Sequence, residues 1–177
     1  IKCSIPYGSG AAVIYFGRKR GMALSKIITA GNPILRMKAE AVTVFDKKLK
    51  LLLKDMKKTL YEADGVGLAA PQIAVSRRIC VIDAGTGYDE YINPVWTAEG
   101  TETDIDTEGC LSVPDLYGEV ERYKKVVIHY QDCHGKKKEK KADGLLARCI
   151  QHEVDHLDGI LFIEKAISLH KSVSPHE

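Results

Sequence analysis

The stretch "CIQHEVDHLDGIL", residues 149–161, places two histidines four positions apart around a glutamate, in a run that otherwise reads as a buried helix. At about 100° per residue, Glu153 falls in the middle of an apolar stripe, with His156 on the stripe and His152 at its edge. The stripe consists of Leu146, Cys149, Ile150 and Leu157. An ionised carboxylate on an apolar face is costly unless a cation or strong donors meet it. Glu153 therefore needs a partner.

Histidines at positions i and i+4 of one helix can reach the same metal ion, and a glutamate between them stands beside the metal-bound water. His152, Glu153 and His156 fit this HExxH pattern. The pattern also occurs by chance in surface helices, where it amounts to polar side chains at a helix margin. The apolar flanks favour the metal site, because such a surface is a poor place for unpaired polar groups.

A catalytic metal site needs a third protein ligand and an open fourth position. The metalloprotease pattern HExxHxxGxxH has Gly159 in register, but Phe162 stands where its third histidine belongs. The glutamate-type alternative expects a ligand on a following helix, and the only glutamates downstream of the motif are Glu164 and Glu177, in a short tail that we expect to be frayed. Upstream, Cys110 in "TEGCLSVP" offers a thiolate preceded by a glycine. A thiolate is a good ligand for such a metal.

Bulk properties restrict the class of protein. The chain has 177 residues, the size of one domain. Its 26 Lys plus Arg against 24 Asp plus Glu give a net charge of +2, which gives no reason to expect a specific nucleic-acid site. No apolar run is long enough to cross a membrane. The five scattered cysteines lack a CxxC pair, which favours a reducing cytosol over a disulfide framework.

The sequence predicts an α+β fold in which mostly antiparallel or mixed sheets pack around a central metal-binding helix over residues 145–157. A first amphipathic helix begins after Asp46, its expected N-cap, and ends near "EADGVG". The same capping role is expected of Asp143 for the second helix. Residues 77–83, 89–94 and 124–132 are typical of strands. The lysine cluster at 136–141 reads as a solvated hairpin arm.

The ends of the chain differ in character from its middle. Residues 1–21 contain no acidic residue and precede Met22, a natural start. They fit a remnant of cloning or, less well, a basic targeting segment. We therefore expect a catalytic domain over residues 22–166 and a C-terminal tail over residues 167–177.

Three motifs together resemble the signature motifs of the peptide deformylases, in that family's order and with similar separations. They are "GVGLAAPQ" (65–72), "EGCLS" (108–112) and "QHEVDH" (151–156). The likeness extends from about Ile27 to about Ala166. Each motif alone is weak, but three complete motifs in order leave little room for coincidence.

The resemblance implies that Cys110, His152 and His156 hold the metal, with water in the fourth position. It implies Fe²⁺ as the physiological ion, with Zn²⁺ or Ni²⁺ as substitutes. It makes Glu153 the general base that takes a proton from the metal-bound water and gives it to the leaving amine. The side-chain amide of Gln72 and the backbone N–H of Leu111 would stabilise the oxyanion. A loop-bracing role for Gln72 is the alternative.

The resemblance also implies how substrate binds. The backbone of Gly67 would hydrogen-bond an extended peptide, and Val66, Leu111 and Cys149 would line an apolar pocket for a methionine side chain. Glu108 and Arg122 match a bracing ion pair of the family. Asp155 lies opposite the apolar stripe, so a solvated helix face is expected for it, with a supporting role behind the metal ligands as the alternative.

The implied function is removal of the N-formyl group from the first methionine of nascent polypeptides, releasing formate. The implied setting is a bacterial cytoplasm, or an organelle if residues 1–21 are a native targeting segment. The basic arm or the tail are candidate ribosome contacts. Two alternatives remain, a zinc endopeptidase and a non-catalytic metal-binding module. No membrane partner is expected.

Overall fold

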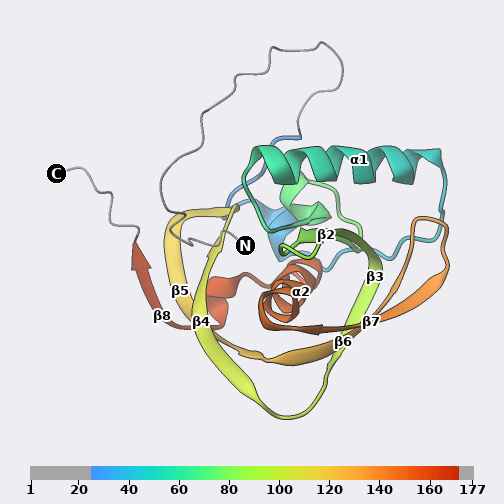
Figure 1. The fold of residues 1–177 in the computed structure, drawn as a ribbon. Helices are drawn as coiled ribbons and strands as arrows, with labels where there is room; N and C mark the ends of the chain where they lie inside the picture. The colour runs from blue at the N-terminus through green and yellow to red at the C-terminus, as the bar shows by residue number, and fades with distance from the viewer. Residues whose placement is uncertain (1–24, 172–177) are drawn as a thin grey trace, which may run out of the picture.

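In the computed structural model, which describes residues 25–171, one helix occupies the centre of the molecule and two sheets surround it (Figure 1). The predicted extension, residues 1–21, lies outside the described residues. The helical elements are η1 (Pro33–Arg36), α1 (Lys47–Glu62), η2 (Ala70–Ile73), α2 (Gly144–Leu157) and η3 (Phe162–Glu164). The strands are β1 (Gly67–Ala69), β2 (Ile79–Asp83), β3 (Tyr88–Ala98), β4 (Thr103–Cys110), β5 (Val113–Tyr123), β6 (Lys125–Gln131), β7 (Lys137–Asp143) and β8 (Ala166–Lys171).

Both sheets are antiparallel throughout. The larger one has the order β1-β2-β3-β6-β7 and the smaller one the order β4-β5-β8. The larger sheet curves around α2, and the smaller sheet stands at the side of the same helix (Figure 1). The predicted α+β architecture around a central helix is therefore confirmed.

Helix α1 forms where its apolar spacing predicts it. The Asp46 side chain accepts hydrogen bonds from the backbone N–H groups of Lys48 and Leu49, at 2.9 and 3.0 Å, and so caps the first turn as expected. The buried face packs into a core cluster with β2 and carries Leu49, Leu53, Met56, Thr59 and Leu60. Lysines cover much of its solvent face.

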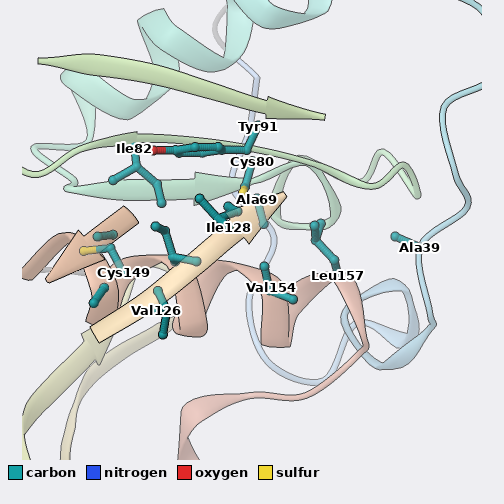
Figure 2. Packing of buried hydrophobic residues seen from close by; sticks show 13 residues of the cluster. Ala39, Ala69, Cys80, Ile82, Tyr91, Val126, Ile128, Cys149, Val154 and Leu157 are labelled. Carbon is teal, nitrogen blue, oxygen red and sulfur yellow. The ribbon is translucent and has the colours of Figure 1, made fainter. Parts of the chain in front are cut away.

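Helix α2 is buried on every side, since all residues from 147 to 157 are buried. Its apolar residues pack in one cluster with β6 and β2. Figure 2 shows Cys149, Val154 and Leu157 spread along the helix, with Val126 and Ile128 on the strand that crosses it. Such a helix must satisfy its polar side chains inside the protein. This position puts the HExxH residues in the interior.

The start of α2 differs in one detail from the prediction. Asp143 occupies the N-cap position, but its side chain makes no capping hydrogen bond. The reason is that Asp143 is also the last residue of β7, where it pairs with Lys125 in extended conformation. The helix then begins directly at Gly144, whose positive φ of 52° makes the sharp change of direction possible.

The β6–β7 hairpin carries the lysine cluster, as predicted. Its turn is closed by a hydrogen bond from the Gly135 N–H to the Asp132 carbonyl at 2.9 Å, and Cys133 and His134 lie in that turn. At the C-terminus the prediction of a tail from residue 167 is wrong for residues 167–171, because β8 pairs with β5 as far as Lys171. Within residues 25–171, no helix is both long and apolar enough to span a bilayer.

Candidate metal centre

Three donor side chains meet at the inner face of the smaller sheet. Cys110 is the last residue of β4, while His152 and His156 project from α2 one turn apart. Their ligand atoms all lie within 4.8 Å of one another, and all three residues are buried. The Sγ of Cys110 is 3.3 Å from Nε2 of His156. The structure thus brings together the three residues that the sequence singled out as ligands.

The donor set fits a divalent cation. His152 Nδ1 lies 2.8 Å from Oε2 of Glu108, so Nδ1 donates and Nε2 carries the lone pair. That Nε2 atom is buried and has no hydrogen-bond partner among residues 25–171. A buried imidazole nitrogen without a partner is costly unless a ligand takes it up. One thiolate and two imidazoles are good ligands for Zn²⁺ and similar ions.

The electrostatics favour the thiolate form of Cys110. Burial raises the pKa of this thiol, but the imidazoles of His156 and His152 outweigh burial and hold the pKa well below its ordinary value. Burial lowers the pKa of His152, but the neighbouring Cys110 thiolate and the hydrogen bond to Glu108 outweigh that effect and raise the pKa to about 9. The neighbouring imidazoles therefore favour the thiolate of Cys110, the form that binds a cation.

A network of buried charges supports His152. Glu108 is fully buried and accepts hydrogen bonds from Arg122 at 2.9 and 3.0 Å, which confirms the expected ion pair. Burial raises the pKa of Glu108, but the hydrogen bonds from His152 and Arg122 outweigh it, so the pKa lies well below its ordinary value. Arg148 adds a further donor to the same carboxylate at 3.0 Å. The sequence reasoning missed Arg148.

Asp155 corrects another expectation. It is 6% exposed rather than solvated, and its carboxylate accepts hydrogen bonds from Arg122 at 2.6 Å and Lys165 at 2.7 Å. The angular position opposite the apolar stripe was right, but the inference from it was wrong, because α2 has no solvated face in this part of the helix. Because α2 is central, protein surrounds it on all sides.

Glu153 lies beside strand β1. It is fully buried, and a Cβ atom added to Gly67 would stand 2.3 Å from its Oε1 atom. The lack of a side chain at Gly67 thus makes room for the carboxylate. The resemblance had assigned Gly67 to the binding of a substrate backbone. The structure shows a second reason for a glycine at this position, which is its direct contact with the Glu153 side chain.

Gln72 also lies close to the thiol of Cys110. Its Oε1 accepts a hydrogen bond from the Ala69 N–H at 2.9 Å, while its Nε2 lies 3.1 Å from Ser112 Oγ and 3.5 Å from Cys110 Sγ. The amide therefore braces the loop after β1, and its N–H₂ group also points at the metal centre. The loop-bracing contact is thus present, and a role of Gln72 in stabilising an oxyanion stays a prediction.

The remaining predicted site residues lie around this centre. Val66 immediately precedes β1, and its carbonyl accepts a hydrogen bond from the Asp83 N–H at 2.8 Å. Leu111 follows Cys110 and is half-buried, and Cys149 is fully buried in the core cluster around α2. Lining of a methionine pocket by these side chains stays a prediction.

Phe162 explains why the downstream ligand pattern fails. Its ring stacks on His152, with 6.1 Å between the ring centroids and an interplanar angle of 24°. The residue that stands in place of a third histidine therefore packs against a ligand instead of joining the set. The ligands come from α2 and β4.

A buried carboxylate beside three converging soft and borderline donors is typical of metal-dependent hydrolases, in which metal and carboxylate act on one water. The central HExxH helix within antiparallel sheets places this chain in that class.

Comparisons with known proteins define the class further. The family model of polypeptide deformylase matches residues 24–172. The peptide deformylase of Caldicellulosiruptor bescii is 54% identical over 147 residues, which cover 82% of this chain and 87% of the relative. That of Pelotomaculum thermopropionicum is 50% identical over 153 residues, covering 86% and 97%.

Solved structures agree. The crystal structure of the Thermotoga maritima peptide deformylase superposes with a TM-score of 0.81 at 41% identity, covering 83% of this chain and all of that one. The Synechococcus elongatus peptide deformylase in complex with actinonin gives a TM-score of 0.79 at 37% identity, covering 90% and 88%. This chain belongs to the peptide deformylase family. It is a metal-dependent hydrolase, and the alternatives of a zinc endopeptidase and a non-catalytic module are not supported.

Proposed function

We propose that this chain removes the N-formyl group from the N-terminal methionine of nascent polypeptides and releases formate, with Cys110, His152 and His156 as metal ligands. The observation that carries the assignment is the convergence of these three donors within 4.8 Å, beside the buried carboxylate of Glu153. Membership of the peptide deformylase family supports the substrate class.

The metal is proposed to be Fe²⁺, with Zn²⁺ or Ni²⁺ as substitutes. A bound cation of this kind supplies Lewis acidity, which polarises the formyl oxygen and makes a neighbouring water more acidic. The thiolate of Cys110 and the neutral imidazoles of His152 and His156 suit all three ions. The choice of iron follows the family resemblance, and it fits a reducing compartment.

Glu153 is proposed to move the proton. Its carboxylate takes a proton from the attacking water and gives it to the nitrogen of the departing amine. Complete burial keeps bulk water from competing for this proton, and the carboxylate lies against Gly67 of β1, the strand beside which the substrate is expected. Glu153 is thus both the proposed proton carrier and a neighbour of the proposed substrate strand.

The developing oxyanion is proposed to receive hydrogen bonds from the Gln72 amide and the Leu111 backbone N–H. Two observations support this assignment. Gln72 Nε2 lies only 3.5 Å from the Cys110 thiol, and Leu111 is the next residue after that thiol. Both donors therefore stand at the edge of the metal centre, and the bond from Ala69 N–H to the Gln72 carbonyl oxygen holds the amide in place.

The substrate peptide is proposed to extend the larger sheet at β1. This strand is the first in the order β1-β2-β3-β6-β7, so only one of its edges is paired within that sheet. An edge strand can accept a peptide through backbone hydrogen bonds, and Gly67 lies on it. Val66, Leu111 and Cys149 are then the proposed wall of the methionine pocket.

The decisive experiment measures formate release from a formyl-Met peptide by anaerobically prepared, iron-loaded protein, and compares it with Glu153→Ala and Glu153→Gln. Loss of a general base typically lowers turnover by about 10²–10⁴-fold. We expect a loss of that size in both variants, with the metal content unchanged. Equal turnover in the wild type and both variants would remove the general-base assignment.

The setting is proposed from the relatives and the substrate. The most similar relatives reported above are bacterial, and a nascent formylated chain is found at a translating ribosome. We therefore assign the protein to a bacterial cytoplasm, with an organelle as the alternative if residues 1–21 are a native targeting segment. The lysine-rich β6–β7 hairpin is the proposed ribosome contact.

A further inference from the structure

Arg148 lies on α2 one turn before His152 and is only 6% exposed. Its guanidinium makes three hydrogen bonds that join α2 to the smaller sheet. Nη1 donates to Oε1 of Glu108 at 3.0 Å and to the carbonyl of Val120 at 2.8 Å, and Nη2 donates to the carbonyl of Asp104 at 2.9 Å. Arg148 therefore ties one carboxylate oxygen to the backbone of both β4 and β5.

The carboxylate of Glu108 is saturated by these neighbours. Oε1 accepts from Arg148 and from Nε of Arg122 at 2.9 Å, and Oε2 accepts from Nη2 of Arg122 at 3.0 Å and from Nδ1 of His152 at 2.8 Å. A carboxylate has about four acceptor positions. Because all four are used, the group has one orientation, and so has the imidazole that donates to it.

We propose that Arg148 is a positioning residue of the metal centre, which fixes Glu108 and through it the ring of His152 whose Nε2 binds the metal. The inference rests on the metal site of the proposed function. Partners that orient a metal-binding histidine through its second nitrogen are part of such sites in general. Here the orienting group is itself anchored to two strands.

Arg122 does not duplicate this anchor. Its Nη1 is engaged by Asp155 at 2.6 Å, and Asp155 also accepts from the half-exposed Lys165. Arg122 thus links Glu108 to side chains, whereas Arg148 links Glu108 to backbone carbonyls. A backbone anchor moves less than a side chain, so Arg148 is the contact that sets the position.

Neutralisation of buried charge does not explain Arg148. With His152 neutral, the network contains two carboxylates (Glu108 and Asp155) and three cations (Arg122, Arg148 and Lys165). Removing Arg148 leaves two of each sign. The loss of Arg148 takes this set from a net charge of +1 to zero and leaves each carboxylate with a cation, so a neutral replacement tests the anchor.

The experiment uses the zinc-loaded full chain and measures the rate of zinc loss to excess chelator in wild type, Arg148→Gln and Arg148→Lys. Loss of an orienting partner typically costs 10–100-fold in metal affinity or activity. We expect zinc loss to be about 10–100-fold faster in Arg148→Gln and intermediate in Arg148→Lys, which keeps one donor. Arg77→Gln, which removes an exposed ion pair with Glu40, is the control and should match the wild type.

A second background separates positioning from folding. In Glu108→Gln, Arg148→Gln should add little to the rate of zinc loss, because the proposed effect passes through the Glu108 carboxylate. Wild-type rates in Arg148→Gln, equal effects in both backgrounds, or failure of both Arg148 variants to fold would each overturn the proposal. Absence of zinc binding by the wild type would instead contradict the metal site of the proposed function.

Discussion

The carboxylate of Glu153 lies so close to the backbone of Gly67 that β1 has no room for a side chain at this position. A Cβ atom there would stand 2.3 Å from Oε1 and 2.8 Å from Cδ, whereas real Cβ contacts stay beyond 3.0 Å. In Gly67→Ala the carboxylate, the strand or both must move by roughly 0.7 Å, a displacement of the size that matters for catalysis. The metal ligands are not in this contact.

A displacement of this size predicts a large catalytic effect. Misplacement of a reacting group by about 1 Å can lower the rate about 10²-fold. We therefore expect kcat/KM for deformylation to fall by about 10- to 100-fold in Gly67→Ala, which corresponds to about 1.4–2.7 kcal/mol of transition-state stabilisation. Metal content should stay at the wild-type level.

The assay is formate release from a formyl-Met peptide, normalised to bound metal. Gly135→Ala is the control, because Gly135 lies in the turn between β6 and β7, has a positive φ of 79° and would place a Cβ atom 3.2 Å from the Phe45 side chain. A residue other than glycine in that backbone conformation costs of order 1–3 kcal/mol of stability. Gly135→Ala should therefore be less stable but turn over normally per bound metal. Wild-type turnover in Gly67→Ala, or an equal loss in both variants, would refute the reasoning.

Two further variants test other contacts. In Cys110, the two imidazoles hold the pKa of the thiol low and so favour the thiolate. We expect Cys110→Ser to lose both its metal and its deformylase activity, as measured by metal analysis and formate release. Retained activity would argue against a thiolate ligand. Glu164 has a lowered pKa because it accepts a hydrogen bond from the Leu161 N–H and pairs with Arg36. Its charge therefore stabilises the fold above pH 4.5, the ordinary pKa of a glutamate, and this contribution is lost as the pH falls through the lowered value. Because the pair is nearly half exposed, Glu164→Gln should lower the free energy of unfolding at pH 7 by less than about 1 kcal/mol, and the difference should shrink below pH 4.5 in thermal melts. An undiminished difference at low pH would contradict this origin.

The sequence predicted best those parts of the fold whose residues are buried in a regular pattern. The strand within residues 77–83 is almost wholly buried and rich in β-branched residues, and α1 shows a clear helical spacing. By contrast, β4 is exposed over its first five residues and β8 over nearly all of its length. Their conformation is set by pairing with β5, which no local pattern reveals.

The site residues that belong to sequence motifs could be predicted. The residues whose role depends on what packs around α2 could not. The three ligand candidates could be named from their spacing and from the family resemblance. Arg148 was missed, and a solvated face was favoured for Asp155, because a helical wheel assigns the side opposite the apolar stripe to solvent. A signal was nevertheless present. A helix expected at the centre of the molecule has no solvated side, so charged residues in its middle imply partners inside the protein.

The geometry of α2 also explains why the third ligand comes from a strand. Two imidazoles one turn apart use one side of the helix, and Phe162, just beyond its end, stacks on His152. The next donor has to approach from the facing sheet. The pairing of β4 with β5 shifts register between Gly109 and Cys110, so that Cys110 opposes Val113 directly after Gly109 opposes Tyr117. Such irregularities re-aim side chains at functional sites. Glu108, two residues earlier on the same strand, holds His152, so one strand end both supplies a ligand and orients another.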